Sequence, residues 1–301
     1  MTDLAGFRCA VASQDRGDDL AGTASTVRSF LLVEHAGPWG ADALRDARLP
    51  DGLGAHLAEE GRRHRVRVLL VRRHGRGDAT ASGVTVFAAR AAGADSWLET
   101  ATLGDVGDVR DVDLAALGAG RSPGFEPHTD PVLAVCTHGR HDACCAERGR
   151  PLAAALAGSS YAETVWECSH IGGDRFAGNL LVLPRGLYYG HLDPAAALDV
   201  AAALADGRLE LDHLRGRSDL AMPVQAAEIA VRRRLELGGL DDVRPTGARR
   251  DGELTTVTLD AVGRQVVVLV RRVLEPAQRL TCGARRDDLV PRFEVEALDA
   301  S

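Results

Sequence analysis

Apolar runs of strand length recur through the first part of the chain, and segments with helical periodicity separate them. The predicted strands there are 30–34, 66–71, 83–89 and 97–103, and the predicted helices are 41–47, 53–62 and 111–117. The resulting order, β-α-β-β-β-α, combines a parallel crossover with antiparallel pairing. The pattern therefore indicates an α/β unit built on a mixed sheet.

A stretch rich in Gly, Pro and Ser, residues 118–124, interrupts this pattern and marks a candidate domain boundary. After it, the predicted strands are 131–136, 164–168, 179–183 and 187–189, and the predicted helices are 142–157 and 194–205. Pro151 is expected to break the first of these helices or to start a fresh turn, because proline lacks the N–H that a helix interior needs. The order of these elements is that of a thioredoxin-like domain.

The last part of the chain has a different pattern, with one predicted helix followed by short strands. The helix is 223–237, and the strands are 254–259, 265–270 and 293–296. We therefore predict an α/β protein with two thioredoxin-like units of β-α-β-β-β-α order, each with a mixed sheet, and a small C-terminal α+β extension. The predicted domains are 1–122, 123–218 and 219–301.

Charge and hydropathy narrow the classes of function. The 301 residues carry a formal net charge of −7, whereas a general nucleic-acid binder needs a basic excess. The arginine-rich run 62–76 alternates with apolar positions and is interpreted as a solvated strand edge. No apolar window approaches the length of a membrane span, and the first residues lack the features of a secretory signal. We expect a cytoplasmic protein that binds neither nucleic acid nor membrane.

The distribution of cysteine and histidine is the main functional signal. The chain has six cysteines, too few for a disulfide scaffold of this length. Four of them, and five of the ten histidines, fall within residues 128–191. In the reducing cytoplasm such clustering indicates metal binding or redox chemistry more often than disulfides. The other two, Cys9 and Cys282, are expected to be ordinary buried residues.

Three cysteines lie in residues 136–145 (CTHGRHDACC), which run from the end of a strand through a loop into a helix. Cys144 and Cys145 occupy the first helical turn, where the positive end of the helix dipole favours thiolates. Successive helical side chains point about 100° apart, so one of the two at most is expected to face a given centre. The two histidines of this segment, His138 and His141, are interpreted as solvated loop residues.

A second cluster lies in residues 167–179 (ECSHIGGDRFAGN). Gly172 and Gly173 allow a tight turn with positive φ. Such a turn can direct the side chains of His170 and Asp174 at one point. Together the two clusters predict a site at the end of the strands of the second unit.

The motifs as a set resemble the sucrase/ferredoxin-like family. Residues 136–145 carry the resemblance together with 169–179 (SHIGGDRFAGN) and 187–190 (LYYG). The segments 22–24 (GTA) and 31–40 (LLVEHAGPWG) are similar to bacterial members of that family. The resemblance implies that 123–218 is a thioredoxin-like ferredoxin domain with a [2Fe–2S] cluster held by two cysteines and two histidines.

The resemblance also implies particular ligands. The spacing of the family's two cysteine ligands matches Cys136 and Cys145, and its His-x-Gly-Gly-His pattern begins at His170. The second histidine of that pattern is replaced here by Asp174, a harder ligand that retains negative charge. The implied cluster ligands are therefore Cys136, Cys145, His170 and Asp174, with Cys168 as a substitute for the carboxylate.

Several functions stay open at this point. The first hypothesis is an iron–sulfur protein that transfers electrons or senses redox state, with no catalytic residue and an unidentified redox partner protein. The same residues also suit zinc. A metal-free thiol peroxidase or disulfide reductase would use Cys136 or Cys144 as its nucleophile. A binding scaffold without chemistry is the fourth hypothesis.

Overall fold

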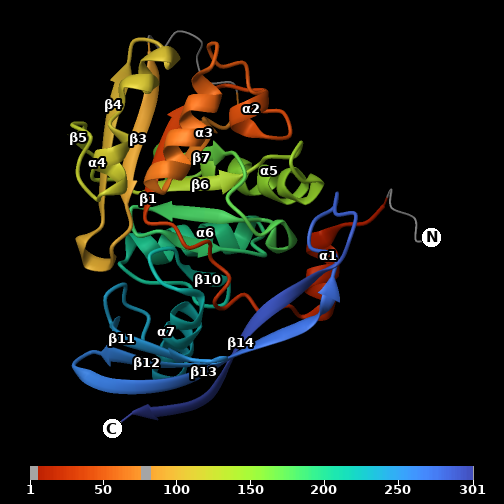
Figure 1. Cartoon of the computed structure of the whole chain (residues 1–301), viewed down its shortest axis with the longest axis vertical. Coiled ribbons are helices and arrows are strands. Elements are labelled where there is room, and N and C mark those ends of the chain that lie inside the picture. Colours follow the sequence, from red (N-terminus) through yellow and green to blue (C-terminus); the bar gives the residue numbers. More distant parts are fainter. Residues whose placement is uncertain (1–5, 76–82, 301) are drawn as a thin grey trace.

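The computed structural model describes residues 6–75 and 83–300, which form a large mixed sheet and a separate antiparallel sheet (Figure 1). The large sheet has ten strands, in the order β10 (Leu214–Arg217), β9 (Leu187–Tyr189), β8 (Leu180–Leu183), β6 (Val132–Cys136), β7 (Val165–Cys168), β2 (Val66–Arg72), β1 (Ser29–Glu34), β3 (Val84–Arg90), β4 (Trp97–Leu103) and β5 (Glu126–Pro127). The α-helices are α1 (Cys9–Arg16), α2 (Ala43–Asp46), α3 (Leu53–His64), α4 (Leu114–Gly118), α5 (Ala143–Ala157), α6 (Pro194–Ala205) and α7 (Met222–Leu235). The 3-10 turns are η1 (Gly93–Asp95), η2 (Val106–Asp111), η3 (Ala162–Thr164) and η4 (Asp174–Phe176).

The two halves of the large sheet have the same internal order. In the first half β1 is parallel to β2 and antiparallel to β3, which is antiparallel to β4. In the second half β6 is parallel to β7 and antiparallel to β8, which is antiparallel to β9. The halves join where β2 pairs antiparallel with β7, at Val71 and Cys168. Strands from both sides of the predicted boundary thus share one sheet.

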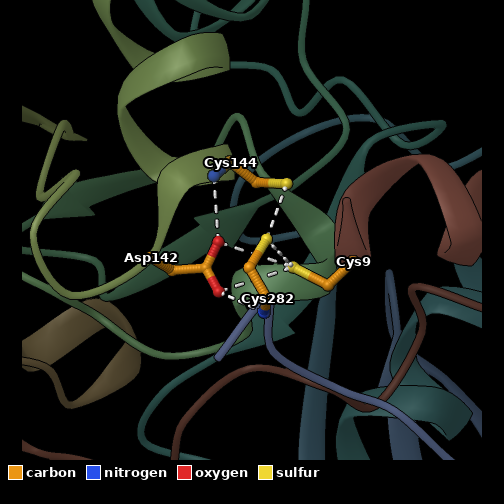
Figure 2. Close-up of side chains that lie close together, drawn as sticks. All are labelled: Cys9, Asp142, Cys144 and Cys282. Carbon is orange, nitrogen blue, oxygen red and sulfur yellow. Dashed lines mark hydrogen bonds between the residues drawn. The ribbon is translucent and has the colours of Figure 1, made fainter. Parts of the chain in front are cut away.

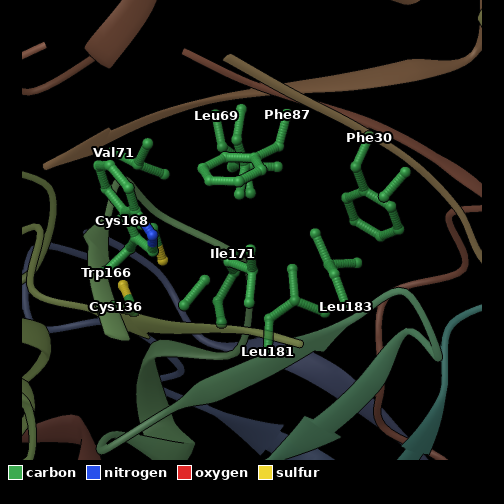
Figure 3. Packing of buried hydrophobic residues seen from close by; sticks show 14 of the residues in the cluster. Phe30, Leu69, Val71, Phe87, Cys136, Trp166, Cys168, Ile171, Leu181 and Leu183 are labelled. Carbon is green, nitrogen blue, oxygen red and sulfur yellow. The ribbon is translucent and has the colours of Figure 1, made fainter. Parts of the chain in front are cut away.

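Hydrophobic residues form separate layers around this sheet. One layer packs α3 and α4 against the first half, and another packs α5 and α6 against the second half. A third layer lies between the two halves, where Phe30, Leu69 and Phe87 from β1–β3 point toward Leu181 and Leu183 of β8 (Figure 3). The sheet therefore bends at the β2–β7 joint, and the two half-sheets pack against each other.

The second sheet is built by the C-terminal part of the chain. Its strands pair in sequence order and are β11 (Val243–Asp251), β12 (Leu254–Ala261), β13 (Arg264–Gln278) and β14 (Asp288–Ala300). Alternate residues of β12 are buried, since one face of the sheet packs against α7. The long β13–β14 hairpin extends beyond this core and reaches α1 at the other end of the chain (Figure 1).

The mixed α/β class is confirmed, and the predicted strands of the large sheet are present with small differences in their ends. The three predicted C-terminal strands are also present, two of them much longer than predicted. The prediction about Pro151 is wrong, because α5 continues through this residue without a break. The sequence analysis did not predict α1, β5, β10 or β11, and it made β13 and β14 too short. These missed segments are rich in charged and polar residues, which hides their structural pattern.

The interpretation of 62–76 as a solvated strand edge is also wrong for the described part of that run. Strand β2 is an interior strand, paired with β1 on one side and β7 on the other. Arg67 donates a hydrogen bond to the carbonyl of His170, and Arg72 binds the carboxylate of Glu167. Arg76 lies outside the described residues. No helix in the described ranges is long and apolar enough to cross a membrane.

Candidate metal site at the end of the second half-sheet

The two cysteines implied as ligands come from adjoining elements. Cys136 is the last residue of β6, and its backbone N–H bonds to the carbonyl of Asn179. Cys145 lies in the first turn of α5, which begins because the Asp142 carboxylate caps the backbone N–H of Cys144 at 2.9 Å. Both thiols are 1% exposed. A strand end and a helix start thus present two buried sulfur atoms to the same place.

The loop after β7 supplies the other two residues. Gly172 and Gly173 have φ values of 97° and 81°, so the chain turns sharply between His170 and Asp174. A Cβ atom on Gly173 would lie 2.4 Å from the guanidinium of Arg215, so this turn packs too tightly for any larger residue. The turn brings the imidazole of His170 and the carboxylate of Asp174 to the two thiols.

The buried guanidinium of Arg215 holds this loop in place. It donates hydrogen bonds to the carbonyl of Gly172 at 3.0 Å, to Oδ1 of Asn179 at 2.8 Å and to the carbonyl of Thr23 at 2.6 Å. Asn179 in turn donates to the carbonyl of Gly173. Arg215 is 1% exposed, and burial lowers its pKa to about 10. Arg215 therefore connects the segment around Thr23 to the loop that contains His170 and Asp174.

The four residues form one compact group, the motif site (Cys136, Cys145, His170 and Asp174). The ligand atoms of Cys136, Cys145 and His170 lie within 4.8 Å of one another. The Cys145 thiol donates to Oδ1 of Asp174 at 3.3 Å, and Nδ1 of His170 lies 2.9 Å from the same oxygen. The buried imidazole of His170 and the carboxylate of Asp174 therefore form a close ion pair.

The charges of the motif site are strongly coupled. The hydrogen bond with Cys145 and the nearby imidazole hold the pKa of Cys136 well below its usual value, although burial opposes this. Burial would lower the pKa of His170, but Asp174 and Cys136 outweigh it and raise that pKa to about 9. The hydrogen bond with Cys136 and burial raise the pKa of Cys145. These shifts favour the charged forms of Cys136, His170 and Asp174 and the protonated form of Cys145.

Two histidines of the first motif adjoin this group. The prediction that His138 is solvated is wrong, because it is 3% exposed. Its Nδ1 accepts the backbone N–H of His170, so its Nε2 must donate to the carbonyl of Gly40. The ring of His141 stacks on that of His170 at 3.8 Å, and its Nε2 lies 3.7 Å from Asp174. His138 thus links the site to the loop after β1, and His141 is a further potential ligand.

The remaining cysteines are not part of the motif site. Cys168 on β7 is the strand partner of Cys136 and belongs to the hydrophobic layer between the half-sheets (Figure 3), and burial raises its pKa well above the usual value. It is in none of the metal-binding groups formed by the described residues. Cys9 is fully buried, as expected, and Cys282 is partly buried, and both lie against Cys144 in a separate group.

Solvent reaches the motif site from its histidine side. A pocket of about 470 Å³ is lined by His141, His170 and Asp174, and also by Leu280 and Thr281 from the β13–β14 loop. The two thiols are not among its lining residues. The C-terminal hairpin therefore forms one wall of the approach to the site, and the sulfur atoms lie behind the imidazole rings.

The sequence analysis missed two residues of this site. His141 lies inside the first motif, so its position was a usable signal, but its stacking on His170 depends on the fold of both loops. Arg215 lies in a polar segment, residues 212–218 (DHLRGRS), and nothing in that pattern indicates burial. Its role follows from β10 pairing with β9 at the edge of the sheet.

Comparison with known proteins gives one match. A family model described as sucrase/ferredoxin-like matches residues 20–216. No curated protein and no solved structure matches the chain. The matched span contains the whole motif site, whereas Cys9 and Cys282 lie outside it.

Proposed function

The chain belongs to the sucrase/ferredoxin-like family, and from this premise we propose that it is an iron–sulfur protein that transfers electrons or senses redox state. In this proposal Cys136 and Cys145 bind one iron of a [2Fe–2S] cluster, and His170 and Asp174 bind the other. The observation that carries the proposal is the convergence of two buried thiols and the imidazole of His170, whose ligand atoms lie within 4.8 Å of one another beside the carboxylate of Asp174.

The chemistry of the donors fits such a group. Thiolates are the usual ligands of iron–sulfur clusters, and histidine replaces cysteine on one iron in Rieske centres. The backbone N–H of His170 donates to His138, and its carbonyl accepts from Arg67, so the residue is directed toward the two thiols. On metal binding, the imidazole and the carboxylate of Asp174, now an ion pair at 2.9 Å, would exchange this contact for bonds to the metal.

The fold supports the same proposal. We infer that the two halves of the large sheet are two thioredoxin-like units, because each has a parallel pair flanked by two antiparallel strands in the same order. The motif site occupies the end of the parallel pair in the second unit, at β6 and β7. A loop of the first unit, around Gly40, contacts this site through His138. Both units would therefore shape the surroundings of a cluster.

The protein residues would set the properties of the group. A bound cluster would supply one-electron chemistry. Asp174 retains a negative charge at the position of the second histidine, which stabilises the oxidised state and lowers the reduction potential. His170 and Cys145 must lose their protons on binding, so metal uptake releases protons and is favoured at higher pH. The exposed edges of His141 and His170 would face a redox partner.

One observation favours a second candidate, a single zinc ion. The ligand atoms of Cys136, Cys145 and His170 all lie within 4.8 Å of one another, and this spacing suits a tetrahedral ion with Asp174 as the fourth ligand. Ligands divided between two irons need a wider site, so a cluster requires the His170 loop to move outward. Zinc would make the motif site structural and redox-inactive.

Iron, acid-labile sulfide and zinc assays on anaerobically purified protein distinguish these functions. The proposal predicts about two irons and two sulfides per chain with visible absorption that bleaches on reduction. Cys136→Ala should abolish both the colour and the iron. Cys168→Ala is the matched control, because Cys168 is equally buried but lies outside the site, and it should keep the cluster. A colourless protein without iron, even after reconstitution with iron and sulfide, would refute the proposal.

A further inference from the structure

A second group of metal-ligating side chains lies beside the first turn of α5. One ligand atom from each of Cys9, Asp142, Cys144 and Cys282 lies within 4.8 Å of the other three. Figure 2 shows the three sulfur atoms gathered in front of the Asp142 carboxylate. We name this group the three-cysteine site. It shares no residue with the motif site, although Cys144 is the neighbour of Cys145.

The separations within the three-cysteine site match those around one metal ion. The sulfur of Cys282 lies 3.4 Å from that of Cys144 and 3.6 Å from that of Cys9. Sulfur atoms bound to one tetrahedral zinc ion at about 2.3 Å are roughly 3.8 Å apart. A disulfide would need about 2.05 Å and would leave the third thiol unpaired. Three sulfur atoms within 4.8 Å of one another, two pairs of them at 3.4 and 3.6 Å, therefore point to a shared metal ion.

The carboxylate of Asp142 completes the arrangement. Its oxygens lie 3.6 and 3.7 Å from the sulfur of Cys9. They also accept the backbone N–H of Cys144 at 2.9 Å and that of Cys282 at 2.6 Å, which fixes the carboxylate's orientation. Each carboxylate oxygen has two lone pairs and accepts one backbone N–H, so one lone pair on each oxygen remains available to a metal. The site thus offers four donors, the number that structural zinc prefers.

The four donors suit a cation because they concentrate negative charge. Three potential thiolates and a carboxylate lie within 4.8 Å of one another. Without a cation, like charges so close together would repel one another, and a divalent cation would remove this repulsion.

Three arginines lie near this group. Arg279 donates a hydrogen bond to the carbonyl of Cys282. Arg8 and Arg175 interact electrostatically with its cysteines, and they also pair with Glu147 at 2.7 Å and with Asp18 at 3.4 Å. A zinc ion with three thiolates and one carboxylate carries a net charge of about −2, which these guanidinium groups offset only in part.

We propose that Cys9, Asp142, Cys144 and Cys282 bind a zinc ion that fastens α1 and the β13–β14 loop to the start of α5. The donors come from positions up to 273 residues apart, so the ion would tie the N-terminal helix α1 and the β13–β14 loop to the large sheet. Thiolate ligands in a closed four-donor site are typical of structural zinc. The proposal does not depend on the function of the motif site, because two of its donors lie outside the family match.

Zinc content and affinity test the proposal. The purified protein should contain zinc that remains bound during dialysis. Chelator-stripped, reduced protein should bind zinc in competition with a chromophoric chelator, and cobalt(II) in its place should give sulfur-to-cobalt charge-transfer bands. Cys282→Ser should weaken zinc binding at this site at least about 100-fold. Cys282 is half-buried in a loop, so this substitution is compatible with folding.

Two further variants separate this site from the motif site. Cys9→Ser removes a second donor and should give the same loss of zinc. Cys136→Ser removes a donor of the motif site alone and should leave this zinc bound, whatever metal the motif site holds. Unchanged zinc affinity in both Cys282→Ser and Cys9→Ser would overturn the proposal. So would a wild-type protein that binds no zinc here and instead forms a disulfide among these cysteines, detected by mass spectrometry.

Discussion

The motif site and the three-cysteine site are neighbours that are assembled in different ways. The motif site takes its residues from two segments of the second half-sheet, 136–145 and 170–174, which the strand order brings together. The three-cysteine site combines one of these segments with the N-terminal helix α1 and the β13–β14 loop. Cys144 and Cys145 point in different directions from the helix, so one turn of α5 supplies a potential ligand to each of the two sites.

Among the variants that distinguish the two sites, replacement of Arg215 should have the largest effect on stability, because Arg215 is buried and supports the motif site alone. Arg215→Met keeps the apolar stem but leaves the carbonyls of Thr23 and Gly172 without their donor. We expect the free energy of unfolding to fall by about 3 kcal/mol or more, with loss of iron and retention of zinc. Chemical denaturation and metal analysis measure these effects.

The control for this variant is Arg233→Met. Arg233 donates to the carbonyl of Leu211 at the surface, so its replacement should change stability by no more than about 0.5 kcal/mol. If Arg215→Met retained full stability and full iron content, the buried guanidinium would have no role in holding the loop.

Asp174→His changes the chemistry of the motif site without touching the three-cysteine site. An imidazole removes the negative charge of the carboxylate, so we expect the reduction potential to rise by on the order of 100 mV. Spectroelectrochemical titration measures the potential. An unchanged or lower potential would show that residue 174 does not bind the cluster, and the zinc content should be the same in both proteins.

Replacement of Glu167, on the strand that leads to the motif site, should have a smaller effect on stability, and this effect should depend on pH. Its buried carboxylate binds Arg72 at 2.7 Å, Thr137 at 2.8 Å and His74 at 2.8 Å, and these contacts lower its pKa against the effect of burial. Since the folded pKa is below the unfolded value of about 4.3, the carboxylate stabilises the protein above that pH. This stabilisation disappears as the pH falls through the folded pKa.

Glu167→Gln should therefore lower the free energy of unfolding by about 1–3 kcal/mol at pH 7 and have little effect once the wild-type carboxyl is protonated. Denaturant unfolding at several pH values checks this. Glu163→Gln is the matched control, because Glu163 is 96% exposed in its ion pair with Arg73. A pH-independent difference between wild type and Glu167→Gln would contradict the electrostatic explanation.

The smallest expected effect is local and follows removal of zinc. Chelation should increase amide hydrogen exchange in α1 and in residues 279–287, because those segments lose their connection to α5. Exchange in β6 and β8, inside the large sheet, should stay the same. Hydrogen exchange followed by mass spectrometry measures both regions. Equal exchange with and without chelator in α1 would show that no metal fastens it.

Local signals explain why much of the fold could be predicted from the sequence. Strand-length apolar runs predicted β1, β2, β6 and β8, and the predicted helices 142–157 and 194–205 begin where Asp142 and Asp193 cap α5 and α6. The turn at Gly172 and Gly173 predicted that His170 and Asp174 face one point, and the resemblance to the family implied Cys136 and Cys145 as their partners. In these cases the determining contacts are close in sequence.

Features that depend on distant contacts could not be predicted. Nothing near Cys9 or Cys282 indicates their partners, which are brought together by the β13–β14 hairpin. The position of β2 inside the sheet follows from its pairing with β7, which joins the two halves. The burial of Arg215 likewise depends on β10 and on the segment around Thr23. Tertiary packing determines all three features, and the neighbouring residues in the sequence contain no signal for them.

The metal content of a single anaerobic preparation tests the central claim, that two independent metal sites share the first turn of α5. Iron, sulfide and zinc are measured per chain in the wild type, Cys136→Ser and Cys282→Ser. We predict about two irons, two sulfides and one zinc in the wild type, loss of iron alone in Cys136→Ser, and loss of zinc alone in Cys282→Ser. Loss of both metals in each variant, or the absence of both from the wild type, would contradict the claim.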